Sequence, residues 1–118
     1  MANARKVVVI GAGPAGYVCA IRLAQLGQDV TVVEREALGG TCLNVGCIPS
    51  KALIAAGSLV HKLDEVEDMG ISVKGVKIDL EKLVAWKQGI VGKLTGGVGI
   101  LLKNHKAKVV YGTATIAD

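Results

Sequence analysis

Apolar and polar residues over the first 34 positions follow the pattern of a strand, a helix and a second strand. Lys6–Ile10 is a continuous run of mainly β-branched residues, which is typical of a buried parallel strand. A stretch with helical spacing follows over Pro14–Gln25 and stops at Gly27, a residue type that commonly ends helices. Gln28–Glu34 is a second apolar run that ends in an acid. The pattern predicts one βαβ unit of a parallel sheet.

The turn between the first strand and the helix carries Gly11, Gly13 and Gly16, at the spacing of a dinucleotide-binding fingerprint. Gly11 permits a tight turn, Gly13 lets the backbone approach a pyrophosphate, and Gly16 lets the helix pack closely on the strand. Free N–H groups at the helix N-terminus would stabilise the pyrophosphate charge. Glu34 can accept hydrogen bonds from ribose hydroxyls and disfavours a 2′-phosphate, so the unit suits FAD or NAD better than NADP. The motif alone does not choose between FAD and NAD, and a glycine turn in another α/β protein is the alternative.

The later hydrophobic pattern predicts two long helices and a third strand. The first helix is expected over residues 47–63, and residues 70–78 are expected to form a loop or a weakly extended segment. Asp79 is a candidate N-cap for a second helix of more than twenty residues. Lys103 and His105 close this helix, where positive charge suits the helix dipole. Lys108–Tyr111 is then expected to be a third parallel strand.

Composition narrows the function classes. The 118 residues suffice for one domain, and with 51% hydrophobic residues, 3% aromatic residues and no Phe the core must be aliphatic. The net charge of +4 comes from scattered lysines without interleaved aromatics, which argues against nucleic-acid binding. The apolar runs are expected to be too short to cross a membrane. The start leads directly into a strand, so no signal peptide is expected, and a reducing, cytoplasmic location is predicted.

Cys42 and Cys47 lie in the stretch Gly39–Lys51, between a glycine pair and a proline. Three interpretations compete: a zinc site, a static disulfide and a redox pair. A zinc site needs about four ligands, and the chain has only three Cys and two widely separated His. A static disulfide does not suit a reducing compartment. A redox pair is therefore favoured, whereas Cys19 is expected to be a buried structural thiol.

Geometry constrains the segment between the two cysteines. Five residues of straight helix separate Cα atoms by roughly 8–9 Å, whereas a disulfide needs less than about 7 Å. The segment therefore cannot be straight helix if the bridge forms. Gly46 supplies the freedom for a break, and Pro49 is tolerated in the first turn of a helix that begins near Cys47. A thiolate at Cys47 would be favoured by the helix N-terminus and by the nearby charge of Lys51.

The stretch Leu38–Lys51 closely resembles the active-site segment of the flavin disulfide reductases, and most closely that of their dihydrolipoamide dehydrogenase branch. The glutathione reductase branch usually has Val where this chain has Leu43 and Ile48, and Lys where it has Ser50. Mercuric reductases share Ser50 but usually have Val at the other two positions. The resemblance extends over essentially all 118 residues. It implies an α/β fold, a Rossmann-like FAD-binding domain with a parallel sheet that is incomplete in this chain.

The resemblance also implies roles for individual residues. Cys42 would be the interchange thiol that meets the substrate, Cys47 the flavin-proximal thiol, and Lys51 a neighbour of the flavin ring edge. Hydride would pass to NAD. The residues implied in FAD binding are Gly11, Gly13, Pro14 and Gly16 at the pyrophosphate, Glu34 with Arg35 at the adenosine ribose, Gly40, Thr41, Cys42 and Lys51 on the flavin side, and Gly112 and Ala114 near the adenine.

The implied partners are dihydrolipoyl groups, carried by a 2-oxoacid dehydrogenase acyltransferase or by the glycine cleavage carrier, and a second subunit in a homodimer. The chain has no second dinucleotide fingerprint and no His–Glu pair for acid/base work. It is therefore expected to be the N-terminal part (residues 1–118) of the FAD-binding domain of a longer enzyme, exposing apolar surface. A non-catalytic FAD-binding fragment and a glutathione or mercuric reductase-like protein are the alternatives.

Five glycines between positions 89 and 99 fall inside the second long helix, where each costs about 1 kcal/mol. Two interpretations stay open. The helix breaks near Gly96–Gly97, or the glycines permit close approach by the flavin domain or a partner subunit.

Overall fold

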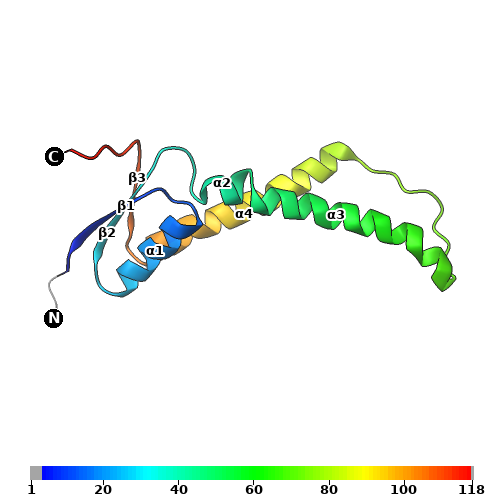
Figure 1. Ribbon diagram of the computed structural model, residues 1–118, viewed down its shortest axis with the longest axis horizontal. Coiled ribbons are helices and arrows are strands. Elements are labelled where there is room, and N and C mark those ends of the chain that lie inside the picture. Colours follow the sequence, from blue (N-terminus) through cyan, green and yellow to red (C-terminus); the bar gives the residue numbers. More distant parts are fainter. Residues whose placement is uncertain (1–3, 118) are drawn as a thin grey trace.

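The computed structural model describes residues 4–117. A small parallel sheet lies at one end of the molecule, and two long helices extend away from it as an arm (Figure 1). The three predicted strands and the three predicted long helices are confirmed in their order, and the two short helices over residues 40–44 and 66–69 were not predicted. The elements are β1 (Lys6–Ile10), α1 (Pro14–Gln25), β2 (Asp29–Glu34), α2 (Gly40–Asn44), α3 (Cys47–Glu65), the short 3₁₀-helix η1 (Val66–Met69), α4 (Leu80–Asn104) and β3 (Lys108–Tyr111).

The sheet is parallel throughout, as the sequence predicted, and its strand order is β1-β2-β3. Strand β2 is central: Val30 pairs with Val7 of β1, and Val32 pairs with Val9 of β1 and Val109 of β3. Helix α1 connects β1 to β2, and the arm connects β2 to β3. The carboxyl ends of the three strands therefore lie at one edge of the sheet, where the loops that carry the predicted site begin.

The core lies between the sheet and the helices α1 and α4. Val30, Val32, Ala20 and Leu102 are fully buried there, which confirms a small aliphatic core. The opposite face of the sheet is bare in the described residues: Val8 and Ile10 are 62% and 63% exposed. Parallel sheets are normally covered on both faces, whereas in the described residues helices cover only one face of this sheet.

The molecule is far more extended than a compact domain of its length. Its dimensions are 67 × 29 × 21 Å. The radius of gyration is 20.4 Å, against about 13–14 Å for a compact chain of this size. The accessible surface is 8796 Å², against roughly 6,000 Å² for a compact monomer of this mass. An apolar groove of about 670 Å³ between α3 and the segment 76–83 adds to the exposed area. The predicted exposure of apolar surface is confirmed.

Helix α4 runs without interruption from Leu80 to Asn104, so the interpretation of a break near Gly96–Gly97 is wrong. Val91, Val98 and Leu102 bury one side of the helix, and this packing offsets the cost of the glycines. A methyl group at Gly89, Gly92, Gly96 or Gly97 would meet nothing within 4 Å in the described residues. Approach by another domain or subunit stays a prediction.

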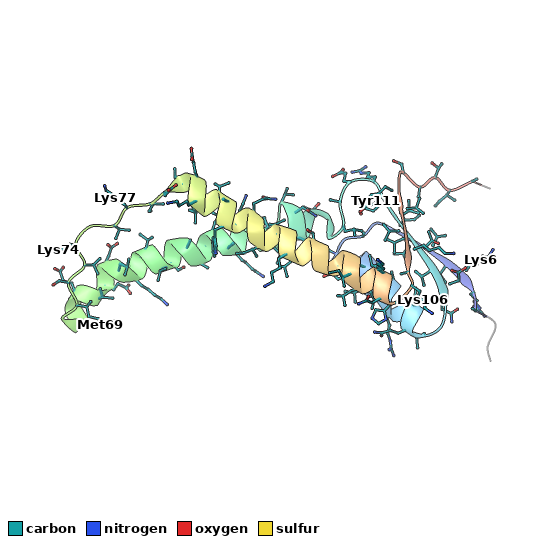
Figure 2. The ribbon with its side chains drawn as sticks, turned by 180° about the vertical axis from the view of Figure 1, so that it is seen from behind. Lys6, Met69, Lys74, Lys77, Lys106 and Tyr111 are labelled. Carbon is teal, nitrogen blue, oxygen red and sulfur yellow. The ribbon has the colours of Figure 1, made fainter. Side chains whose placement is uncertain are left out.

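The two ends of α4 are capped. Asp79 is the N-cap, as predicted, and its Oδ1 accepts a hydrogen bond from the N–H of Lys82 at 3.1 Å. At the other end Lys106 has a left-handed φ of 61°, at the turn from α4 into β3 (Figure 2). The N–H groups of Lys106 and Ala107 donate to the carbonyls of Lys103 and Leu102, each at 3.0 Å. This is a Schellman motif in which lysine holds the position that usually carries glycine.

Two sequence expectations need correction. Cys19 is exposed, because α1 buries the side that carries Ala20 and one residue turns a helix by about 100°. The expectation that no apolar run could cross a membrane was too strict: Gly40–Met69 is long and apolar enough by length and composition alone. This segment is broken between α2 and α3, and a single such segment is weak support for a membrane span.

Candidate functional site

The loop that joins β1 to α1 forms the floor of the site. The N–H of Gly11 donates to the carbonyl of Val33 at 2.8 Å, and Gly11 has a φ of 93°. The first bond of α1 runs from the N–H of Tyr17 to the carbonyl of Gly13 at 3.0 Å. The preceding N–H groups of the first turn, at Ala15 and Gly16, therefore have no acceptor within the helix. Such groups bind phosphate readily.

Gly16 packs directly on this loop. A Cβ at position 16 would collide with the carbonyl oxygen of Gly11. The predicted close packing of the helix is confirmed, and any side chain here would push α1 away from the loop.

Glu34 ends β2 with its side chain turned into the loop rather than into solvent. The residue is 8% exposed. Its Oε2 accepts from the N–H of Ala12 at 2.7 Å, and its Oε1 accepts from the N–H of Glu36 at 2.8 Å. The bond from Ala12 is the main cause that lowers the pKa of Glu34, against the opposing effect of burial. Each carboxylate oxygen can accept a second hydrogen bond, so the ribose role of Glu34 stays a prediction.

Sequence reasoning missed this link between Glu34 and the loop. An acid at the end of the second strand was the available signal, but it does not say which donors the acid meets.

The glycine pair Gly39–Gly40 joins the segment that carries Cys42 and Cys47 to the same loop. The two residues have φ values of 91° and 58°. The N–H of Gly39 donates to the carbonyl of Ala12 at 2.8 Å. A Cβ on Gly40 would lie 2.8 Å from the Cα of Gly13. Helix α2, which carries Thr41 and Cys42, therefore begins in contact with the dinucleotide loop.

The helix is interrupted between the two cysteines, as the disulfide geometry required. Helix α2 ends at Asn44 and α3 begins at Cys47. Gly46 has φ −112° and ψ −113°. A Cβ on Gly46 would lie 2.9 Å from the carbonyl oxygen of Thr41 and 3.2 Å from the Cα of Cys42. The break folds the start of α3 back onto α2 and brings Cys47 to Cys42.

Both cysteines are thiols in this structure. A hydrogen bond with Cys47 is the main cause that raises the pKa of Cys42, burial adds to the effect, and the charge of Lys51 opposes it. Cys42 is half-buried, whereas Cys47 and Lys51 are exposed. The resemblance implied that Cys42 meets the substrate, yet Cys47 is the more exposed of the two sulfurs. The reason is that nothing among the described residues covers the start of α3. The separate roles of the two sulfurs stay predictions.

Two clefts meet at Glu34. The first has a volume of about 350 Å³ and the second of about 330 Å³, both at the lower end of small-molecule sites. The first is lined by Gly13, Glu34, Arg35, Glu36, Ala37, Gly40, Thr41, Asn44 and Val45. The second is lined by Ile10, Gly11, Val33, Glu34, Arg35, Gly112, Thr113 and Ala114.

Most of the predicted cofactor residues are thus brought together. Gly112 is held beside Glu34, because its N–H donates to the Glu34 carbonyl at 2.8 Å. The two clefts share Glu34 and Arg35, and their linings reach from Ala114 to Gly13 and Thr41. Four predicted residues line neither cleft: Pro14, Gly16, Cys42 and Lys51. Within residues 4–117, no group of three His, Cys, Asp or Glu side chains could hold a metal ion.

Comparison with known proteins decides the family. Residues 5–118 match the family described as pyridine nucleotide-disulphide oxidoreductase. The chain belongs to this family. The fold is therefore a partial Rossmann-like FAD-binding domain, and the resemblance to the flavin disulfide reductases is confirmed. FAD and NAD are the cofactors of this family.

Similar proteins agree with this assignment. The chain is 59% identical over 111 residues to a dihydrolipoyl dehydrogenase of Bacillus subtilis, covering 94% of this chain and 24% of that protein. It is 55% identical over 113 residues to one of Geobacillus stearothermophilus, covering 96% and 24%. The crystal structure of LpdA from Mycobacterium tuberculosis matches with a TM-score of 0.82 at 28% identity, covering 92% of this chain and 23% of that one. The chain spans about a quarter of the length of these relatives.

Proposed function

We propose that residues 1–118 are the N-terminal, FAD-binding and disulfide-bearing part of a dihydrolipoamide dehydrogenase, which oxidises dihydrolipoyl groups and passes the electrons to NAD. One observation carries the proposal. The break at Gly46 brings the Cys47 thiol to Cys42, on a helix whose Gly40 packs against Gly13 of the dinucleotide loop. A dithiol–disulfide couple is thereby held beside a dinucleotide cleft.

The residues present fit FAD. The free N–H groups of Ala15 and Gly16 would hold the pyrophosphate, and Glu34 would hold the adenosine ribose between the two clefts. A side chain at Gly13 or Gly40 would narrow the first cleft. When bound, FAD would supply a two-electron acceptor for the cysteine pair, with NAD as the final acceptor.

The chemistry of the chain itself is thiol–disulfide exchange. With Cys42 and Cys47 oxidised, one substrate thiolate attacks the Cys42 sulfur, breaks the bond to Cys47 and forms a mixed disulfide. Cys47 leaves as a thiolate. The second substrate thiol then attacks the substrate sulfur of the mixed disulfide, so that the cyclic lipoyl disulfide forms and the Cys42 thiolate leaves. The substrate loses two electrons and two protons: the cysteine pair gains the electrons, and the protons pass to solvent, which can reprotonate the two cysteine thiolates.

Cys47 is the first residue of α3, and Lys51 lies four residues further along that helix. We further propose that dihydrolipoyl groups reach the site on an acyltransferase or glycine cleavage carrier, and that the enzyme is a cytoplasmic homodimer. The names of the relatives support a lipoyl-group partner and a dimer, and the cytoplasmic location is proposed from the cysteine usage of the chain alone.

The test is turnover by the whole natural protein. With dihydrolipoamide and NAD⁺, it should form NADH, and Cys42→Ser and Cys47→Ser should each lower kcat by at least about a thousandfold because the covalent route is removed. The matched control is Cys19→Ser, which removes an exposed thiol on α1. This variant should keep the wild-type rate. Unchanged turnover in either active-site variant, or a preference for glutathione disulfide with NADPH, would contradict the proposal.

A spectroscopic measurement separates the two sulfurs. Two-electron reduction of the natural protein should produce a long-wavelength charge-transfer band, and Cys47→Ser should abolish it. A band that persists in that variant would exclude the flavin-proximal role of Cys47. Residues 1–118 by themselves are expected not to turn over.

A further inference from the structure

The side-chain amide of Asn44, the last residue of α2, donates hydrogen bonds to the first residue of that helix and to the turn before it. Its Nδ2 donates to the carbonyl of Leu38 at 3.0 Å and to the carbonyl of Gly40 at 2.8 Å. A side-chain amide has two N–H groups, so both are used. The side chain is half-buried and forms part of the wall of the first cleft.

These two carbonyls flank Gly39, the residue at the centre of the turn. Gly39 and Gly40 both have positive φ, and a pair of glycines has great conformational freedom in the absence of other constraints. Asn44 restricts that freedom by tying the end of α2 back to its start. The N–H of Gly39 then connects the same turn to Ala12 of the dinucleotide loop at 2.8 Å.

Cys42 lies inside this closed unit, and Cys47 lies outside it. The chain leaves α2 directly after Asn44, through Val45 and Gly46, and reaches Cys47 as the first residue of α3. Position and direction of α2 therefore decide how near the Cys42 sulfur lies to the Cys47 sulfur. Five residues of helix contain too few hydrogen bonds to hold α2 in place by themselves.

We propose that Asn44 is a positioning residue, which holds α2 so that Cys42 stays within bonding reach of Cys47 and thereby stabilises the disulfide relative to the dithiol. This inference rests on the proposed function in that it takes the two cysteines to be a redox couple. Removing the tie allows the dithiol form a wider range of sulfur–sulfur separations. The effective concentration of one thiol at the other falls, and the equilibrium shifts toward the dithiol.

The relevant equilibrium is measured against glutathione. The dithiol of Cys42 and Cys47 reacts with glutathione disulfide to give the protein disulfide and two molecules of glutathione. Two protein thiols are oxidised, and one glutathione disulfide is reduced. The equilibrium constant needs neither bound flavin nor turnover to be read.

The experiment compares Asn44→Asp with Asn104→Asp in the whole natural protein. The first variant keeps the shape of the side chain but turns both donors into acceptors that face carbonyl oxygens. The second makes the same chemical change at an exposed residue at the far end of α4. Samples are equilibrated in glutathione buffers, quenched in acid, alkylated and digested with trypsin. Cleavage after Arg35 and Lys51 releases both cysteines in one peptide, whose mass reports the oxidised fraction.

Asn44→Asp should shift the equilibrium toward the dithiol by about tenfold, the effect of losing roughly one to two neutral hydrogen bonds. Asn104→Asp should stay within about twofold of the wild type. Asn44→Ser, whose hydroxyl can replace one of the two bonds, should give an intermediate shift, and it serves as the test if the aspartate variant does not fold.

The outcomes separate the two proposals. A wild-type pair that forms no reversible disulfide overturns the proposed function and the role of Asn44 with it. A wild-type pair that titrates normally, with Asn44 variants that match it, overturns only the role of Asn44. A lowered unfolding temperature with an unchanged redox equilibrium gives Asn44 a merely structural role and also overturns the inference.

Discussion

Gly40→Ala is expected to weaken FAD binding in the whole natural protein. The backbone at this position has a φ of 58°, a conformation that costs an alanine about 1–2 kcal/mol. The new Cβ would lie 2.8 Å from the Cα of Gly13, whereas carbon atoms in contact prefer about 3.5–4.0 Å. The loop and α2 must therefore separate by roughly 1 Å, and overpacking of this kind costs about 1–3 kcal/mol.

The two contributions together are about 2–5 kcal/mol. If the bound state bears the cost, the Kd of FAD rises at least about thirtyfold, because every 1.4 kcal/mol is a factor of about ten. The assay removes FAD from the purified protein and measures its rebinding by the quenching of flavin fluorescence. Thiol alkylation of the same samples reports whether Cys42 becomes more accessible as α2 moves away from the loop.

Gly57→Ala is the matched control. Gly57 lies inside α3, and a methyl group there would meet nothing within 4 Å among residues 4–117. Alanine in an exposed helix interior should stabilise the fold by about 1 kcal/mol and leave the Kd of FAD unchanged. Wild-type affinity in Gly40→Ala would refute the reasoning, because it would mean that the contact between α2 and the loop is not required for binding.

Two further substitutions test the hydrogen bonds and the backbone that hold this end of the fold together. Glu34→Gln should destabilise the domain by about 2–3 kcal/mol at neutral pH, since it removes two hydrogen bonds to a charged acceptor and can replace only one with a neutral bond. The pKa of Glu34 is lowered in the fold, so its contribution to the free energy of unfolding is present above the unfolded pKa of about 4.3 and is lost as the pH falls through the folded pKa. The stabilities of wild type and variant, measured by urea unfolding, should therefore converge in acid. An equal difference at neutral and acidic pH would contradict this role. Lys106→Gly should stabilise the fold by about 0.5–1 kcal/mol, because glycine adopts the left-handed backbone conformation without strain. Lys103→Gly, inside the last turn of α4, should destabilise the fold by about 1 kcal/mol. Thermal unfolding of the two variants measures both effects, and a loss of stability in Lys106→Gly would show that the backbone there is not strained.

Local patterns were enough to predict most of the elements. Strands β1 and β2 and the helix between them follow from apolar periodicity and from glycines at fixed spacing, which act over a few residues. The break between the cysteines followed from covalent geometry, because a straight helix cannot bring residues five apart within disulfide reach. Helix α4 was harder: its glycines left a break as one of two interpretations, but the burial of Val91, Val98 and Leu102 outweighs their cost.

The sequence by itself therefore determined the βαβ unit, the dinucleotide fingerprint and the interruption of the helix between Cys42 and Cys47, because each depends on residues that are close along the chain. Tertiary structure decided what these parts contact. Only the folded chain shows that the Glu34 carboxylate bonds to Ala12, that Gly40 packs on Gly13, and that Asn44 closes the turn before Cys42. It also decided which side of α1 is buried and hence that Cys19 is exposed. These contacts join segments distant in sequence, and residue spacing carries no information about which distant donor meets which acceptor.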